Sequence, residues 1–112
     1  MNVVRGTLDG KRFASDGASI PTPVGGTIAN AVLGVRPEDC TVVAPAKADL
    51  KGEIYTTELI GDHTLVTVKT GHDMLAVKAA KDFTARQGEK AGVSFSTSRL
   101  FVFDEATGLR VR

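Results

Sequence analysis

Short apolar runs with a period of two recur along the chain, and almost every run ends at a glycine, an aspartate or a proline. In 64–70 and 74–78, the pairs Val66/Val68 and Leu75/Val77 each fall on one face of an extended segment. A period of two is typical of strands, because successive side chains point to opposite faces. The pattern therefore predicts many short antiparallel strands.

The expected strands share β-branched content and turn residues at their ends, and they are 1–8, 11–15, 18–20, 31–35, 40–44, 51–60, 64–70, 74–78, 93–97, 100–103 and 109–111. Asp9-Gly10 is the strongest hairpin signal, and Asp16-Gly17 predicts a second turn. Two prolines and two glycines interrupt 21–26, which is expected to be a loop. The only helix-compatible stretch, 79–87, lacks an amphipathic stripe.

An all-β barrel or sandwich follows from these segments, and the 12 glycines fit its many tight turns. The expected core consists of the apolar residues on the inner faces: Val35, Ile54, Val66, Val68, Leu75, Val77, Val93 and Phe95.

Size and charge narrow the class of protein. With 112 residues, the chain is one domain or a fragment of one. Its net charge of +1 gives no electrostatic argument for nucleic acid or an anionic membrane. No run of about 18 apolar residues is present, and 1–11 lacks the apolar core of a signal peptide, so a cytosolic context is expected.

The reactive residue types are sparse. Cys40 is the only cysteine, which excludes an intrachain disulfide and a cysteine-based zinc framework; a small, partly buried thiol is expected. His63 and His72 each stand beside an aspartate in a turn, which favours solvated turn residues over a metal site. No serine lies in a G-x-S-x-G elbow, so no enzyme is predicted.

Single-stranded nucleic acid is not an expected ligand either. Proteins that bind it stack bases on aromatic side chains over a basic groove. The chain has no Trp, one Tyr and five Phe, and most of the Phe lie in apolar runs that favour the core.

The run 31–35 ends abruptly at Arg36-Pro37-Glu38. Pro37 removes a backbone donor and biases Arg36 away from helical geometry, so the strand stops there. The pattern alone favours a strand end with two solvated charges. The alternative is a turn that Arg36 and Glu38 tie down by charged hydrogen bonds.

The segment from Gly34 to Glu38 resembles the G-[VI]-R-P-E motif of the TOBE domain. This OB-like β module is the C-terminal regulatory region of the ATP-binding subunits of sugar-importing ABC transporters, of the type that imports maltose or glycerol 3-phosphate. Further along, 52–64 resembles the family hairpin that contains Glu58, Gly61 and Thr64, although Ile60 departs from the usual register.

Three further segments fit the same family. Residues 87–90 resemble the turn before its next-to-last long strand, and 100–108 resembles its ending L-x-x-F-D-x-x-[TS]-G. Met1-Asn2 followed by Gly6 is similar to the segment where the ATPase domain gives way to the regulatory one. The resemblance covers 1–112 in order, and implies a single regulatory domain excised from a longer chain.

The resemblance implies a parent chain that uses ATP and Mg²⁺ as a dimer. That parent would act with a membrane permease at the cytoplasmic face of the bacterial membrane. This segment itself has no Walker A motif, because Gly6 and Gly10-Lys11 stand one residue too close and Arg12 replaces the magnesium-binding Ser or Thr. No cofactor is expected here, and ATP should neither bind nor be hydrolysed.

The family motifs imply structural or regulatory roles for seven residues: Gly34, Arg36, Pro37, Glu38, Glu58, Gly61 and Thr64. If their partners are buried, replacing Arg36 or Glu38 by Ala should lower stability by about 1–3 kcal/mol. Phe101 and Phe103 lie in a run that is apolar on both faces, so they form a possible interface with a second copy.

Two functions remain open at this stage. The first is a regulatory and dimerising module that acts by contact. The second is a sensor that binds a sugar or an oxyanion and modulates transport. The scattered basic residues favour the first.

Overall fold

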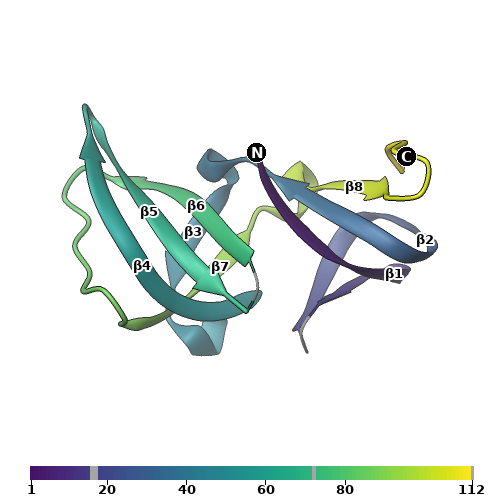
Figure 1. Ribbon diagram of the computed structural model, residues 1–112, viewed down its shortest axis with the longest axis horizontal. Helices are drawn as coiled ribbons and strands as arrows, with labels where there is room; N and C mark the ends of the chain where they lie inside the picture. The colour runs from purple at the N-terminus through teal and green to yellow at the C-terminus, as the bar shows by residue number, and fades with distance from the viewer. Residues whose placement is uncertain (16–17, 72, 112) are drawn as a thin grey trace.

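The structure, a computed structural model, describes residues 1–15, 18–71 and 73–111. It measures 40 × 26 × 20 Å and has two lobes side by side along its longest axis (Figure 1). Each lobe is built on one antiparallel sheet, with the strand orders β1-β2-β8 and β3-β7-β4-β5-β6. The strands are β1 (Asn2–Ser15), β2 (Ala18–Val35), β3 (Cys40–Val43), β4 (Leu50–Ile60), β5 (His63–Thr70), β6 (Asp73–Ala80), β7 (Lys90–Phe95) and β8 (Phe101–Asp104).

Three 3₁₀ turns are the helical elements of the described part of the chain: η1 (Pro37–Asp39), η2 (Pro45–Lys47) and η3 (Thr97–Arg99). No helix among the described residues is long and apolar enough to cross a membrane. Because the regular elements of the described residues are strands and short 3₁₀ turns, the all-β prediction is confirmed.

The five-stranded sheet curls into the OB-like barrel that the sequence predicts. Its two edge strands, β3 and β6, line the same pocket of about 230 Å³ together with Phe83. Sheet edges that approach in this way leave few unpaired backbone groups exposed to other chains.

The predicted hairpin at Asp9-Gly10 is wrong, because β1 runs through it. Gly10 pairs with Gly26 of β2, next to a register shift, and it adopts a φ of +63° that favours glycine. The antiparallel pair of β1 and β2 forms a two-stranded ribbon. This β1–β2 ribbon folds back on itself, and Asp9-Gly10 lies at the corner. The hydroxyl of Ser15 donates to the carbonyl of Arg5 at 2.9 Å across the fold.

The loop predicted for 21–26 is also wrong, because these residues belong to β2. Pro21 lies opposite Arg12 in β1, whereas β8 pairs only with 31–34 of β2. The proline segment therefore lies at an open edge, where a missing N–H breaks no ladder. The turn predicted at Asp16-Gly17 lies outside the described residues.

The predicted strand 109–111 is only an isolated bridge between Phe103 and Arg110. The carbonyl of Val102 accepts a 2.7 Å hydrogen bond from the N–H of Val111, which holds this segment beside β8. With a single bridge, the segment does not form a further strand of the sheet.

All eight predicted core residues are buried. The core also includes residues of the ribbon and of the ends of the barrel strands that the pattern did not single out: Val4, Leu8, Phe13, Ile20, Ala31, Leu33, Cys40, Leu50, Ala91, Leu100 and Val102. One hydrophobic cluster therefore joins the two lobes.

A side-chain amide links the two sheets at the N-terminus. The Oδ1 atom of Asn2 accepts from the N–H of Ala76 at 2.8 Å, and its Nδ2 donates to the carbonyl of the same residue at 2.7 Å. The amide thus pairs with the free edge of β6 as a further strand would. Figure 1 shows the N-terminus at the seam between the lobes.

We expect Gly6→Ala to lower the free energy of unfolding by about 1–3 kcal/mol, the range for overpacked sites. A Cβ at Gly6 would overlap the carbonyl oxygen of Ala14 and approach the Phe13 ring to 2.8 Å. Urea unfolding measures the effect. Gly25→Ala is the matched control, because its Cβ would meet only Lys11 Cγ at 3.3 Å and Gly10 atoms beyond that. Equal effects in the two variants would contradict the folded-back ribbon.

Candidate functional site

The Arg-Pro-Glu turn closes through its backbone. The N–H of Asp39 donates to the carbonyl of Arg36 at 2.9 Å, and Cys40 Sγ donates to the same carbonyl at 3.4 Å. Arg36 is extended, with φ −79° and ψ 148°, as a residue before proline should be. The turn therefore holds its shape without charged side chains.

The predicted charged hydrogen bonds are absent from the described residues. The guanidinium of Arg36 instead lies 4.9 Å from the centre of the Phe101 ring, and that of Arg110 lies 4.4 Å from the same centre. Glu38 is exposed and forms no hydrogen bond or ion pair with any described residue. Arg36 is thus tied to β8 by a cation–π contact, while Glu38 is solvated.

The outward side of the three-stranded sheet is apolar. We call the residues Met1, Val3, Val32, Phe101 and Phe103 the outer face; the strand register places the last four on the same side of the sheet. Met1 is 63% exposed and Val3 48% exposed, and both phenylalanines are half-buried. The Arg5–Glu105 ion pair, at 3.2 Å, borders this surface.

Gly34 shapes the outer face. A Cβ at this position would lie 3.1 Å from Met1 Sδ and 3.3 Å from Phe103 Cε2. The missing side chain lets Met1 and Phe103 lie over β2, which gives a physical reason for glycine at this motif position.

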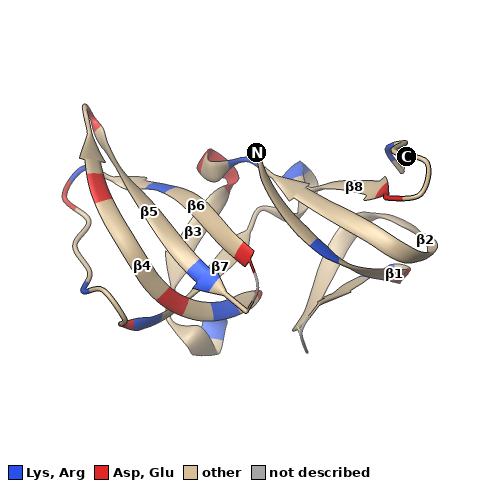
Figure 2. Ribbon diagram, in the orientation of Figure 1, with Lys and Arg blue, Asp and Glu red and all other residues tan. Residues whose placement is uncertain are grey.

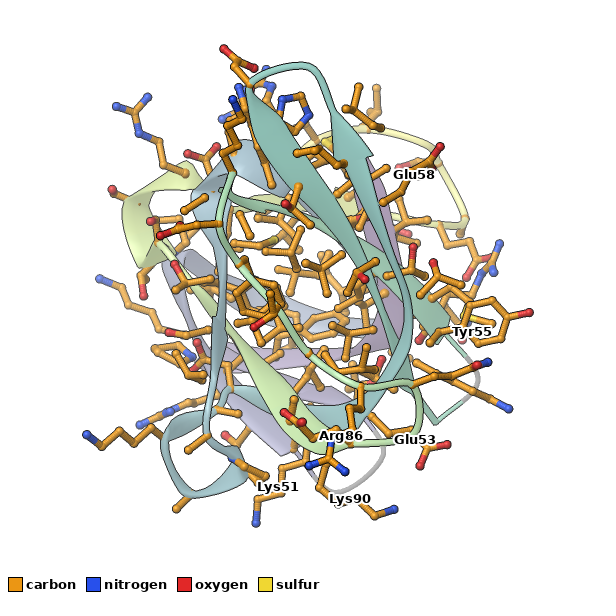
Figure 3. The ribbon with its side chains drawn as sticks, turned by 90° about the vertical axis from the view of Figure 1, so that its left-hand side faces the viewer. Lys51, Glu53, Tyr55, Glu58, Arg86 and Lys90 are labelled. Carbon is orange, nitrogen blue, oxygen red and sulfur yellow. The ribbon has the colours of Figure 1, made fainter. Side chains whose placement is uncertain are left out.

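The other three motif residues lie on the barrel, away from this surface. Glu58 of β4 is exposed and projects outward from the barrel, as Tyr55 does (Figure 3). Gly61 forms the β4–β5 turn with a φ of +60°. Thr64 is buried and donates to the carbonyl of Lys81 at 3.1 Å, which ties the hairpin to the segment after β6.

Asp62 and His63 form a hydrogen-bonded pair at the β4–β5 turn. His63 Nδ1 lies 3.0 Å from Asp62 Oδ1, and this hydrogen bond lowers the pKa of the exposed Asp62 carboxyl. No three potential metal ligands cluster among the described residues. His72 lies outside those residues.

Cys40 is buried beside the turn. Burial raises the pKa of its thiol to about 11, because a thiolate there would lose its hydration; the hydrogen bond from Asn2 lowers this pKa, but the loss of hydration outweighs it. The thiol is therefore protonated at neutral pH, which makes it a poor nucleophile.

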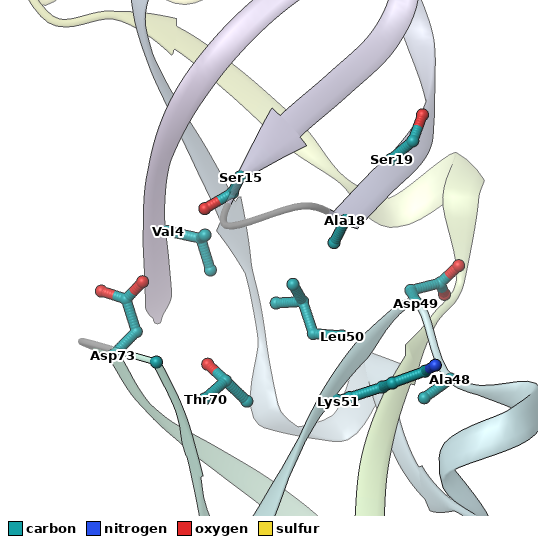
Figure 4. Close-up of a pocket in the computed structure, with 11 residues that line it drawn as sticks. Val4, Ser15, Ala18, Ser19, Ala48, Asp49, Leu50, Lys51, Thr70 and Asp73 are labelled. Atoms are coloured by element: carbon teal, nitrogen blue, oxygen red, sulfur yellow. The ribbon is translucent and has the colours of Figure 1, made fainter.

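A pocket of about 390 Å³ lies between the two sheets (Figure 4). Val4 and Ser15 of β1 line one side, and Asp49, Lys51 and Thr70 line the other. No pattern in the sequence predicts this site, because its polar residues come from strand ends far apart in the chain. Only the fold brings them together.

Charges of both signs are mixed over the molecule. Figure 2 shows both blue and red segments along β4 and along the loop after β6. Lys90 Nζ and Glu53 Oε2, for example, are 3.2 Å apart. A mixed surface of this kind gives no field that would attract a polyanion.

Comparisons with known proteins agree with this geometry. A family model for the TOBE domain matches residues 33–103. The chain belongs to the TOBE domain family.

Its relatives include subunits of ABC transporters. The chain is 26% identical over its whole length to the ABC transporter ATP-binding protein YcjV of Escherichia coli K12, and it spans 34% of that protein. It is 29% identical over 74% of its length to the multiple sugar-binding transport ATP-binding protein MsmK of Streptococcus mutans, of which it covers 23%. The chain thus spans about a third or less of these relatives.

The fold has a solved counterpart. The cytoplasmic molybdate-binding protein ModG superposes with a TM-score of 0.72 over 90% of this chain and 94% of its own, at 14% identity. This likeness supports the OB-like fold.

The two motif charges should differ in their effect on stability. Arg36→Ala should lower the free energy of unfolding by about 0.5–1 kcal/mol, because an exposed cation–π contact is lost. Glu38→Ala should change it by less than about 0.5 kcal/mol, as for most exposed positions. Urea unfolding of both variants tests this difference, and a larger loss in Glu38→Ala would refute it.

Proposed function

We propose that the chain is the regulatory and dimerisation domain of the ATP-binding subunit of a bacterial sugar importer, located C-terminally in that subunit. The TOBE family match and the names of YcjV and MsmK support this proposal. The parent subunit would bind ATP and Mg²⁺ and work with a membrane permease at the cytoplasmic face. The domain itself would act by contact, without a cofactor.

The outer face is the observation that carries the contact role. It is an apolar sheet surface that stays partly exposed, with Met1 and Val3 open to solvent and Phe101 and Phe103 half-buried, although Arg36 and Arg110 lie over the Phe101 ring. Exposed apolar patches with a polar border mark interaction sites. A second copy of the subunit is the proposed partner. Within the transporter, the ATPase contacts would raise the effective concentration of the two domains.

Ligand sensing is a second candidate function. ModG is named for its binding of molybdate, and this chain has a pocket between its sheets. The polar groups of that pocket come from Ser15, Asp49, Lys51 and Thr70, among others, and they restrict the class of ligand that could bind.

We expect the isolated chain to form a weak homodimer, with a dissociation constant on the order of micromolar or weaker, because an interface confined to one face of a three-stranded sheet would be small. Sedimentation equilibrium should show a monomer–dimer equilibrium that Phe103→Asp abolishes. Phe103 is preferred over Phe101, because an aspartate at 101 would lie beside two guanidinium groups.

Leu59→Asp is the matched control, because Leu59 is 60% exposed on the other lobe. This variant should dimerise like the wild type. A wild-type chain that stays monomeric at millimolar concentration would overturn the contact role, and so would loss of dimers in Leu59→Asp alone.

A further inference from the structure

We propose that the pocket between the two sheets binds a neutral polyhydroxylated small molecule of the size of a monosaccharide or polyol. Thr70, Asp49 and Lys51 would supply its hydrogen bonds. The pocket, of about 390 Å³, falls within the usual range of small-ligand sites, and both sheets contribute to its walls. This inference is independent of the self-association proposed above.

Thr70 provides the strongest evidence for a ligand. Its side chain is buried, with 5% of the residue exposed, and its Oγ1 atom has no hydrogen-bond partner among the described residues. Its methyl group would touch a Cβ built at Gly52, so the methyl faces β4. Figure 4 shows the hydroxyl directed toward the Val4 side of the pocket. Buried hydroxyls without a partner are rare and call for an explanation.

Asp49 and Lys51 place an acceptor and a donor on the same wall. Asp49 Oδ2 accepts from the N–H of Phe95 at 2.8 Å, which fixes the carboxylate and leaves Oδ1 available. Lys51 is exposed and forms no ion pair with the described residues, so its ammonium group is available as a donor. A sugar hydroxyl both donates and accepts, so it fits such a mixed set.

The balance of charge favours a neutral ligand over an oxyanion. The carboxylate of Asp49 and the ammonium group of Lys51 both line the pocket and carry opposite charges. A wall without excess positive charge gives a sulfate or a molybdate no net attraction, whereas a polyol needs none. The pocket is thus unlike a cluster of cations built for an anion.

The test measures the melting temperature of the 112-residue chain with D-glucose, maltose and glycerol, and separately with sodium sulfate and sodium molybdate at matched ionic strength. At about ten times its dissociation constant, a binding sugar should raise the melting temperature by about 5 °C. Non-specific stabilisation by sugars acts on every variant, so the comparison with Thr70→Val isolates the effect of the site.

Thr70→Val should melt at or above the wild-type temperature without ligand, because it removes an unpaired hydroxyl, and it should lose the site-specific shift. Thr41→Val, an exposed threonine on β3, should keep that shift. Lys51→Gln changes only an exposed side chain and should weaken binding by about tenfold. If Thr70→Val fails to fold, this variant tests the site in its place. Equal shifts in wild type and Thr70→Val, or a larger shift with sulfate or molybdate than with any polyol, would overturn the proposal.

Discussion

The side-chain amide of Asn2 is the contact on which the arrangement of the two sheets depends. It pairs with both backbone groups of Ala76, on the outer edge of β6. Hydrophobic burial holds the sheets together but does not fix their relative orientation, because it is non-directional. The two hydrogen bonds are directional, and they fix the position of β1 relative to the barrel. The amide also approaches Cys40 Sγ at 3.7 Å, so strand β1 and the Arg-Pro-Glu turn share one junction.

The outer face and the pocket between the sheets both lie next to this junction. Because side chains alternate along a strand, fixing Asn2 in the seam directs Val3 to the outer face and Val4 into the pocket between the sheets. The turn that follows β2 then places Arg36 over Phe101, at the border of the outer face. One anchored strand therefore positions a surface suited to a protein partner and a cavity suited to a small ligand.

The sequence predicted the barrel well, because its hairpins are local and one face of each strand is buried. Val66 and Val77 show this, since they pair across β5 and β6 and both belong to the core. The β1–β2 ribbon was misread because glycines there form a corner and the prolines lie at an open edge. The pocket had no sequence signal, because Asp49 and Thr70 meet only after the sheets pack. The glutamate of the motif, Glu38, forms no hydrogen bond or ion pair with the described residues, so the prediction that it ties down the turn had no local contact behind it.

The most direct test of the Asn2 junction compares Asn2→Ala with Asn2→Asp by urea unfolding. Asn2→Ala should lower the free energy of unfolding by about 1–3 kcal/mol, because it leaves the N–H and carbonyl of Ala76 without partners. Asn2→Asp keeps an acceptor for the N–H of Ala76 and should therefore lower the free energy of unfolding by less than Asn2→Ala does. Asn30→Ala, at an exposed position of β2, should have little effect. If Asn2→Ala unfolds like the wild type, the amide does not hold the sheets together.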